Sequence, residues 1–168
     1  MEQEVAQLIT NLEAQVGTHR DLLDLVRMER THLVELNLED LSKVTHHKHL
    51  VIHQIQKLEK QRQTIMLELG AYYMGEEPTL AQIKESVQQR DSRAHERLES
   101  IDKTLNLLIE RIQIQNRHNM AVVESSLKHV TNMKKNVLGE VVKTAETYTK
   151  RGTKDSPTRS AHLFQKEI

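Results

Sequence analysis

Cysteine is absent from this chain of 168 residues, which excludes disulfide bonds and thiolate chemistry. Tryptophan is absent as well, and the aromatic residues are three tyrosines and one phenylalanine, so a core has to be built from aliphatic side chains and methionine. With five glycines and two prolines, long helices meet few breakers. This composition suits narrow seams between helices, and we expect an all-α protein.

Charge and hydropathy argue against a nucleic-acid-binding protein and against a membrane protein. The formal net charge is zero, so nucleic-acid binding has little bulk electrostatic support. Only one aromatic residue, Tyr148, lies among the basic residues Lys143, Lys150, Arg151, Lys154 and Arg159, so base stacking is poorly supplied. No apolar run approaches the roughly 20 residues that span a bilayer, and the first residues lack the basic start of a signal peptide. We therefore expect a soluble, cytoplasmic protein with no nucleic-acid partner and no membrane insertion.

Apolar residues recur at alternating steps of four and three in two consecutive segments, about residues 2–36 and 38–69. Such a repeat keeps the apolar stripe on one side of a helix and favours a supercoiled partner. The two helices, each about 50 Å long, are joined by a very short connection, which forces them antiparallel. Asn37 followed by Asp40 predicts a reciprocal N-cap for the second helix. The predicted stripes are Val5, Ile9, Leu12, Val16, His19, Leu23, Val26, Arg30 and Leu33, then Leu41, Val44, Lys48, Val51, Ile55, Leu58, Arg62, Ile65 and Leu69.

A loop is expected over residues 70–78, and Thr79 with Gln82 predicts a capping box that opens a short helix over about 80–89. A third long helix follows over about 93–147, capped by Asp91 or Ser92. The first stripe of this helix is Leu98, Ile101, Leu105, Leu108 and Ile112. After a polar stretch comes a second stripe, Met120, Val123, Leu127, Val130, Lys134, Val137 and Val141. The interval from Ile112 to Met120 breaks the repeat, so the second stripe is rotated against the first.

The third helix is predicted to be about 80 Å long, whereas the hairpin offers only about 50 Å. Its last third, about residues 120–147, would have nothing in its own chain to pack against. Because an apolar stripe left in water is a site for another molecule, we expect this segment to bind a partner. The alternatives are that the helix folds back on itself or pairs with its twin in a homodimer. The predicted contact residues are Met120, Val123, Leu127, Val130, Val137 and Val141.

Tyr148 is a lone aromatic residue where the helix is expected to fray, so it serves either as a loose cap or as an anchor in a partner's pocket. The polar segment 149–168, rich in helix breakers, is expected to be a disordered tail. The domain prediction is thus one helical domain over residues 1–148, followed by the tail.

Polar residues on the stripes leave several alternatives. We expect Lys48, Arg62, His19 and Arg30 to set the register or to lie at a dimer rim, with the long cations reaching to the edge. Asn116 and Asn119 interrupt the third helix, where asparagine either fixes the register on a seam or is solvent-exposed.

Four histidines, two of them at a spacing of four on one helical face, could in principle hold Zn²⁺. No cysteine or carboxylate lies within the next turn, so an exposed, adventitious cluster is the preferred interpretation, and no metal or cofactor is predicted. The four are His46, His47, His49 and His53. There is also no glycine-rich phosphate loop, nucleophile elbow or carboxylate pair in a plausible cleft, so we predict no catalytic residue and no enzymatic activity.

Short segments in a fixed order resemble the FlgN family of flagellar type III export chaperones over about residues 15–152. Two match the opening helix and its turn, Leu22-Leu23-Asp24-Leu25 with Glu29-Arg30, and Asn37-Leu38-Glu39-Asp40-Leu41 followed by Lys48 and Leu50. Two match the C-terminal part, Asn116-Arg117-His118-Asn119 leading to Ser126-Leu127 and Val130, and Tyr148-Thr149-Lys150-Arg151-Gly152. The tail from Thr153 to Ile168, with its Leu163-Phe164 pair, departs from the family pattern.

The resemblance implies a cytoplasmic chaperone that binds hook-associated proteins of the hook–filament junction, prevents their premature assembly and delivers them to the membrane export gate. It further implies that the C-terminal amphipathic helix holds the client and that a tyrosine, here Tyr148, docks at the gate. The second stripe of the third helix falls where the client is expected to bind. The alternative is a homodimeric coiled-coil adaptor without a secretion client.

Overall fold

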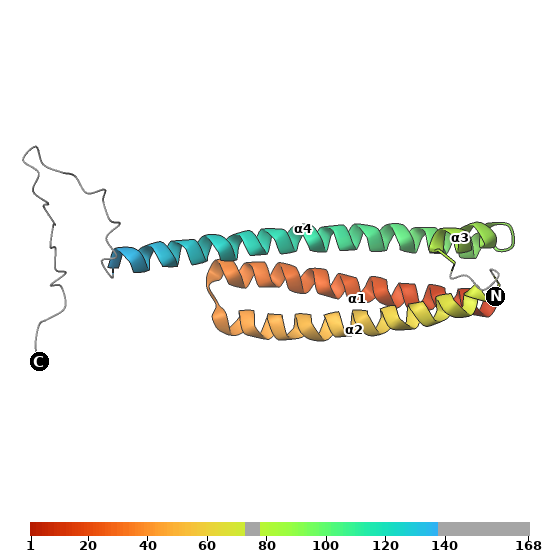
Figure 1. Cartoon of the computed structure of the whole chain (residues 1–168), viewed down its shortest axis with the longest axis horizontal. Coiled ribbons are helices and arrows are strands. Elements are labelled where there is room, and N and C mark those ends of the chain that lie inside the picture. The colour runs from red at the N-terminus through yellow and green to blue at the C-terminus, as the bar shows by residue number, and fades with distance from the viewer. Residues whose placement is uncertain (73–77, 138–168) are drawn as a thin grey trace, which may run out of the picture. The chain divides into compact units, whose positions relative to one another are not determined.

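The structure, a computed structural model, describes residues 1–72 and 78–137 (Figure 1). Within these ranges the chain forms helices and no strands, which confirms the predicted all-α class. The helices are α1 (Glu2–Glu35), α2 (Leu38–Gly70), α3 (Leu80–Gln88) and α4 (Ser92–Val137). The chain divides into two units after Val122, so α4 contributes its first part to one unit and its last part to the other. None of the described helices is both long and apolar enough to cross a bilayer.

The connection between α1 and α2 is as short as predicted, and Leu36 makes it so by adopting a left-handed backbone conformation with φ of 56°. The amides of Leu36 and Asn37 both donate to the His32 carbonyl, which ends α1 at Glu35, one residue earlier than expected. The Asn37 side-chain oxygen caps α2 by accepting from the Asp40 amide at 3.2 Å. The Asp40 carboxylate in turn accepts from the Asn37 side-chain nitrogen at 2.8 Å, since the Asn37 backbone amide is already engaged. The cap is therefore reciprocal through side chains.

Helix α1 lies between α2 and the first part of α4 in the unit that ends at Val122 (Figure 1). Most of its predicted stripe is buried, whereas the stripe of α2 is largely half-buried. The reason is that α1 is covered on two sides and α2 on one. The first stripe of α4 is buried as predicted, over Leu98, Ile101, Leu105, Leu108 and Ile112.

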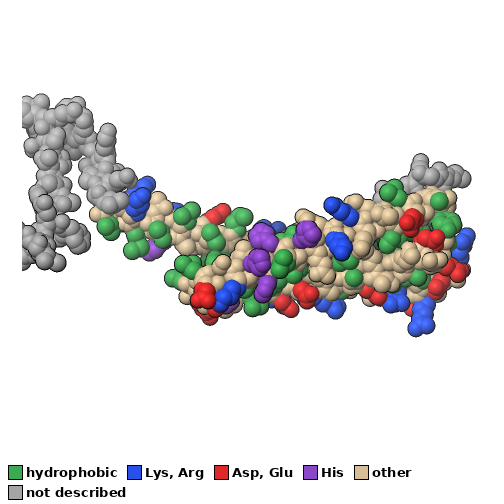
Figure 2. Space-filling model, turned by 90° about the horizontal axis from the view of Figure 1, so that it is seen from below, with side chains coloured by type: hydrophobic (Ala, Val, Ile, Leu, Met, Phe, Trp, Pro, Cys, Tyr) green, Lys and Arg blue, Asp and Glu red, His purple; other side chains and the backbone are tan. Residues whose placement is uncertain are grey.

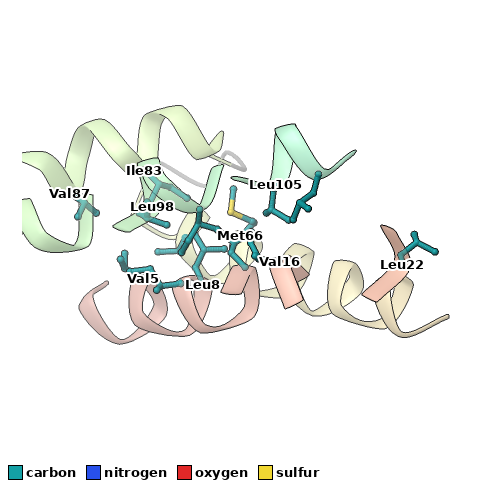
Figure 3. Close-up of a cluster of buried hydrophobic side chains, with 14 of the residues drawn as sticks. Val5, Leu8, Val16, Leu22, Met66, Ile83, Val87, Leu98 and Leu105 are labelled. Atoms are coloured by element: carbon teal, nitrogen blue, oxygen red, sulfur yellow. The ribbon is translucent and has the colours of Figure 1, made fainter. Parts of the chain in front are cut away.

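The core brings together aliphatic side chains from all four helices. Leu8 of α1, Met66 of α2, Ile83 of α3 and Leu98 of α4 are all almost fully buried and point toward one another (Figure 3). No aromatic side chain belongs to this cluster of described residues, in keeping with the composition. Close packing of leucine, isoleucine, valine and methionine therefore supplies the hydrophobic stabilisation of this unit.

Polar contacts fix the register of the three long helices. The Asn11 amide donates to the Leu58 carbonyl of α2 at 3.1 Å, and Gln15 donates to the Asn11 side-chain oxygen at 3.1 Å. On the other side of α1, Arg97 of α4 makes a two-pronged pair with Glu13, at 2.7 and 3.0 Å. Since this ion pair is about half exposed, it orients the helices more than it stabilises them.

The predicted capping box of α3 is present, with Thr79 and Gln82 each accepting from the other's backbone amide. Lys84 then ties α3 to α4 through the carboxylates of Glu99, at 2.8 Å, and Asp102, at 2.7 Å. Hydrogen bonds from Lys84, and then from Lys103, lower the pKa of Glu99 from 4.5 to about 2. The short helix is thus held to α4 by charge as well as by its apolar side.

The lowered pKa of Glu99 predicts an acid-dependent loss of stability. The contribution of this carboxylate is complete above its ordinary pKa of 4.5 and is lost as the pH falls toward the folded-state value of about 2. We expect the thermal midpoint to fall over this window, and to fall less in Glu99→Gln, as measured by circular dichroism melts at several pH values. Glu110→Gln, at an exposed carboxylate of the same helix, should keep the parent profile. Identical acid profiles for Glu99→Gln and the parent would contradict the assignment.

Candidate functional site

The second stripe of α4 is exposed to solvent along its described length. Its five described apolar residues leave between 46% and 74% of their surface exposed, namely Met120, Val123, Leu127, Val130 and Val137. Val141 and Tyr148, which were predicted to belong to the client and gate contacts, lie outside the described residues. A run of exposed aliphatic side chains on one helical face is uncommon on a protein that works alone.

Sequence reasoning missed one member of this surface. Met133 is also about half exposed and lies three residues after Val130, so it widens the stripe. The repeat had assigned the corresponding position to Lys134, which is exposed as well. The signal that could have found Met133 is the spacing of three from Val130 and four from Val137. We refer to Met120, Val123, Leu127, Val130, Met133 and Val137 as the apolar stripe.

The helix that carries the apolar stripe begins at a defined cap. The Asp91 carboxylate accepts from the Ala94 amide at 2.9 Å, which selects Asp91 from the two predicted caps. Neither glycine nor proline interrupts the sequence from there to Val137, so the helix continues through the polar stretch. The apolar stripe offers dispersion and hydrophobic contacts, which suit the apolar face of another helix.

At Asn119 and Met120 the apolar residues of α4 no longer lie on its buried face. Asn119 is 4% exposed, whereas Met120, the next residue, is 64% exposed. Adjacent residues of an α-helix point about 100° apart, so the apolar stripe is rotated from the seam that Leu98 to Ile112 make with the rest of the core. This agrees with the rotation predicted from the sequence. The helix therefore buries an asparagine while it exposes a methionine.

A cluster of polar side chains surrounds Asn119. Its side-chain nitrogen donates to the Val26 carbonyl and to the Glu29 carboxylate of α1, both at 2.9 Å. Its side-chain oxygen accepts from Gln115 at 3.3 Å. Lys48 of α2 donates to both oxygens of Glu29 at 2.7 Å, so three helices meet in this layer. We refer to Glu29, Lys48, Gln115 and Asn119 as the polar layer.

The polar layer decides between the alternatives left open by the sequence. Asn119 lies on the seam, whereas Asn116 is exposed to solvent. Lys48 was expected to reach the edge, but its side chain is only 16% exposed because Glu29, itself 15% exposed, pairs with it. An ion pair this deep needs both members, since removing one leaves a buried charge without a partner.

Two other polar residues of the stripes, His19 and Arg62, have partners on their own helices. The buried His19 ring nitrogen Nδ1 lies 2.7 Å from the Gln15 carbonyl. Arg62 pairs with Glu59 of its own helix at 2.7 Å, and this guanidinium is the first cause of a lowered pKa of the Glu59 carboxyl. Both contacts are local to one helix.

The four histidines of α2 gather on one exposed face (Figure 2). The rings of His46 and His47 lie 6.3 Å apart between centroids, without stacking. Among the described residues, no group of three or more histidine, aspartate or glutamate side chains converges on a point where a metal ion could bind. The spacing of His49 and His53 thus offers two donors at most, which is fewer than a structural zinc site uses.

Comparison with protein families gives one result that covers most of the chain. The model of the family described as FlgN protein matches residues 1–156, which include every described residue of the apolar stripe and of the polar layer. Comparisons with curated proteins and with solved structures find no match.

Proposed function

This chain belongs to the FlgN family, a family of flagellar export chaperones, and from that premise we propose that it holds hook-associated proteins of the hook–filament junction before their export. It would bind the amphipathic terminal helix of a client in the cytoplasm, prevent premature assembly and deliver the client to the membrane export gate. The identity of the clients and their delivery to the gate are inferred from the resemblance of the sequence to this family.

The observation that supports client binding is the exposed apolar stripe of α4. Full burial of one valine, leucine or methionine side chain contributes about 1.5–3 kcal/mol, so six such residues offer ample gross energy for binding a helix, from which the entropic costs of association are subtracted. A client helix laid along the stripe would have its own apolar face covered and could not assemble with its partners. Holding of this kind requires no nucleotide, metal or covalent step, and it is reversible.

Tyr148 is the proposed contact with the export gate. We expect Tyr148→Ala to leave client capture unchanged and to reduce export of the client by about tenfold or more, because one buried aromatic anchor contributes 2 kcal/mol or more. Secretion of a junction protein into the medium, measured beside pull-down by the same variant, tests both halves. The matched variant Tyr148→Phe keeps the ring and should export better than Tyr148→Ala. Export by Tyr148→Ala at the parent level would contradict a gate contact at this residue.

The apolar stripe could instead pair with its twin in a homodimeric adaptor, and one experiment separates the two functions. Light scattering at increasing concentration gives the mass of the free chain, and addition of a purified junction protein gives the mass of any complex. A chaperone should form a one-to-one complex that contains the client. A tight dimer that ignores the junction protein, and that Leu127→Asp dissociates, would favour the adaptor and overturn the proposal.

A further inference from the structure

A lysine lies within the apolar stripe of α4. Lys134 follows Leu127 by seven residues and precedes Val137 by three, so it lies on the same side of the helix as these two side chains. Its side chain is exposed, as theirs are, and all three residues belong to the unit that begins at Val123. A partner that covers both Leu127 and Val137 therefore also has to cover this cation.

Lys134 makes no ion pair within the described part of the chain. No aspartate or glutamate stands three or four positions before or after it in the sequence, which are the spacings at which charges pair along a helix. An apolar surface laid over its ammonium group would remove water from a charge and offer nothing in exchange. A carboxylate that satisfies Lys134 in a complex therefore has to come from the partner.

Elsewhere in this chain, lysines covered by a neighbouring helix are paired with carboxylates of that helix. Lys48 belongs to the stripe of α2, and its side chain, 16% exposed, does not reach the edge but pairs with Glu29 of α1 at 2.7 Å. Lys84 of α3 is equally shielded and pairs with Glu99 of α4 at 2.8 Å. The same solution for Lys134 requires a carboxylate on the helix that covers the apolar stripe.

We propose that Lys134 selects the partner of the apolar stripe, which is an amphipathic helix with one carboxylate within its apolar face, placed to meet Lys134. Aliphatic contacts along the stripe supply affinity, whereas the ion pair fixes the register and excludes helices that are apolar or basic at that point. The same lysine opposes parallel pairing of two identical stripes, because the two ammonium groups would meet. This inference rests on the proposed function, since it names the kind of client helix that the stripe accepts.

A membrane surface fits this stripe less well than a helix does. Helices that lie on a bilayer carry their lysines on the polar face, and their apolar face includes large aromatic side chains. Lys134 lies within the apolar face instead, and residues 120–137 contain no phenylalanine, tyrosine or tryptophan. Insertion of this face into a bilayer would carry the ammonium group toward the acyl chains, which is costly.

Designed helical peptides test this selection with the full chain. Three dye-labelled peptides share one leucine face and differ only at a central position of that face, which holds glutamate, glutamine or lysine. Fluorescence anisotropy gives the affinity of the chain for each peptide. We expect the glutamate peptide to bind at least about tenfold more tightly than the glutamine peptide, and the lysine peptide to bind most weakly because its charge repels Lys134.

Substitutions at two lysines of α4 make the test specific. Lys134→Glu should reverse the order of affinities, so that the lysine peptide binds most tightly. Lys134→Leu should abolish the advantage of glutamate over glutamine. Lys128→Glu is the matched control, because Lys128 is exposed on the same helix but points away from the apolar stripe, and this variant should keep the parent order. Helix content from circular dichroism accompanies every measurement.

Equal affinities of the parent for the three peptides, no peptide binding at all, or the same reversal in Lys128→Glu as in Lys134→Glu would overturn selection by Lys134. If a purified junction protein is nevertheless captured, the proposed function stands without this inference. If neither the peptides nor the junction protein binds, both fail. Glutamate-peptide binding that survives Val123→Asp with Leu127→Asp would place the peptide away from the stripe and overturn the inference. Binding to vesicles of phosphatidylserine and phosphatidylcholine that Lys134→Glu weakens would assign the stripe to a membrane surface instead.

Discussion

Simultaneous replacement of Val123 and Leu127 by aspartate is expected to abolish capture of a hook–filament junction protein while the helix content of the chain stays unchanged. Both side chains are exposed, so their replacement removes no core contact. Each aspartate removes about 1.5–3 kcal/mol of potential apolar burial and would also bring an unpaired charge against the client. The affinity should therefore fall by more than about a hundredfold, as measured by calorimetric titration or quantitative pull-down.

A matched control separates the effect of the face from the effect of charge. Ser125→Asp with Asn132→Asp adds the same two charges to exposed positions on the opposite side of the same helix. Capture by this control variant should remain close to the parent level. If both double variants capture equally well, the apolar stripe is not the client site, whatever the family membership implies.

Replacement of Leu69 by alanine is expected to destabilise the chain by about 3.5 kcal/mol, the middle of the range for a buried leucine. Leu69 is completely buried in the cluster that joins all four helices, and this cluster has no aromatic side chain among its described members to compensate for a lost methyl or methylene group. For a chain of this length, such a change lowers the thermal midpoint by about 10 °C. Urea unfolding followed by circular dichroism gives the free energy directly.

Leu67 provides the control for this prediction, since it lies two residues away on the same helix and is 64% exposed. Leu67→Ala makes the same chemical change, but it should alter the free energy of unfolding by no more than about 0.5 kcal/mol. Similar losses for the two variants would mean that the packing of α2 differs from the packing described above.

Much of the fold could be predicted because the signals are local. The period of 3.5 residues, the Asn37 cap and the Thr79 capping box each depend on residues within one or two turns, and all three features are present in the structure. The exposed stripe was also predictable, at least as a pattern that breaks the repeat after Ile112. The end of α1 differs by one residue from the expected position, because the left-handed backbone conformation of Leu36 sets that end.

Partners that are distant in sequence were beyond prediction from the pattern. Asn119 and Glu29 lie 90 positions apart, and no periodicity indicates that a seam asparagine will meet that particular carboxylate. Lys48 was assigned to the edge for the same reason, since a lone cation on a stripe normally reaches water when its counter-ion is unknown. The choice between Asn116 and Asn119 likewise depended on which of the two faced α1.

By itself, the amino-acid sequence determined that the chain is helical, where its helices begin, and that one apolar stripe does not continue the seam before it. These properties follow from local backbone preferences and from hydrophobic periodicity, which act within a single helix. The tertiary structure alone decided that α1 lies between α2 and the first part of α4, and that Asn119, Glu29 and Lys48 meet in one layer. Those properties depend on the distances between side chains of different helices, which only the packing of the folded chain establishes.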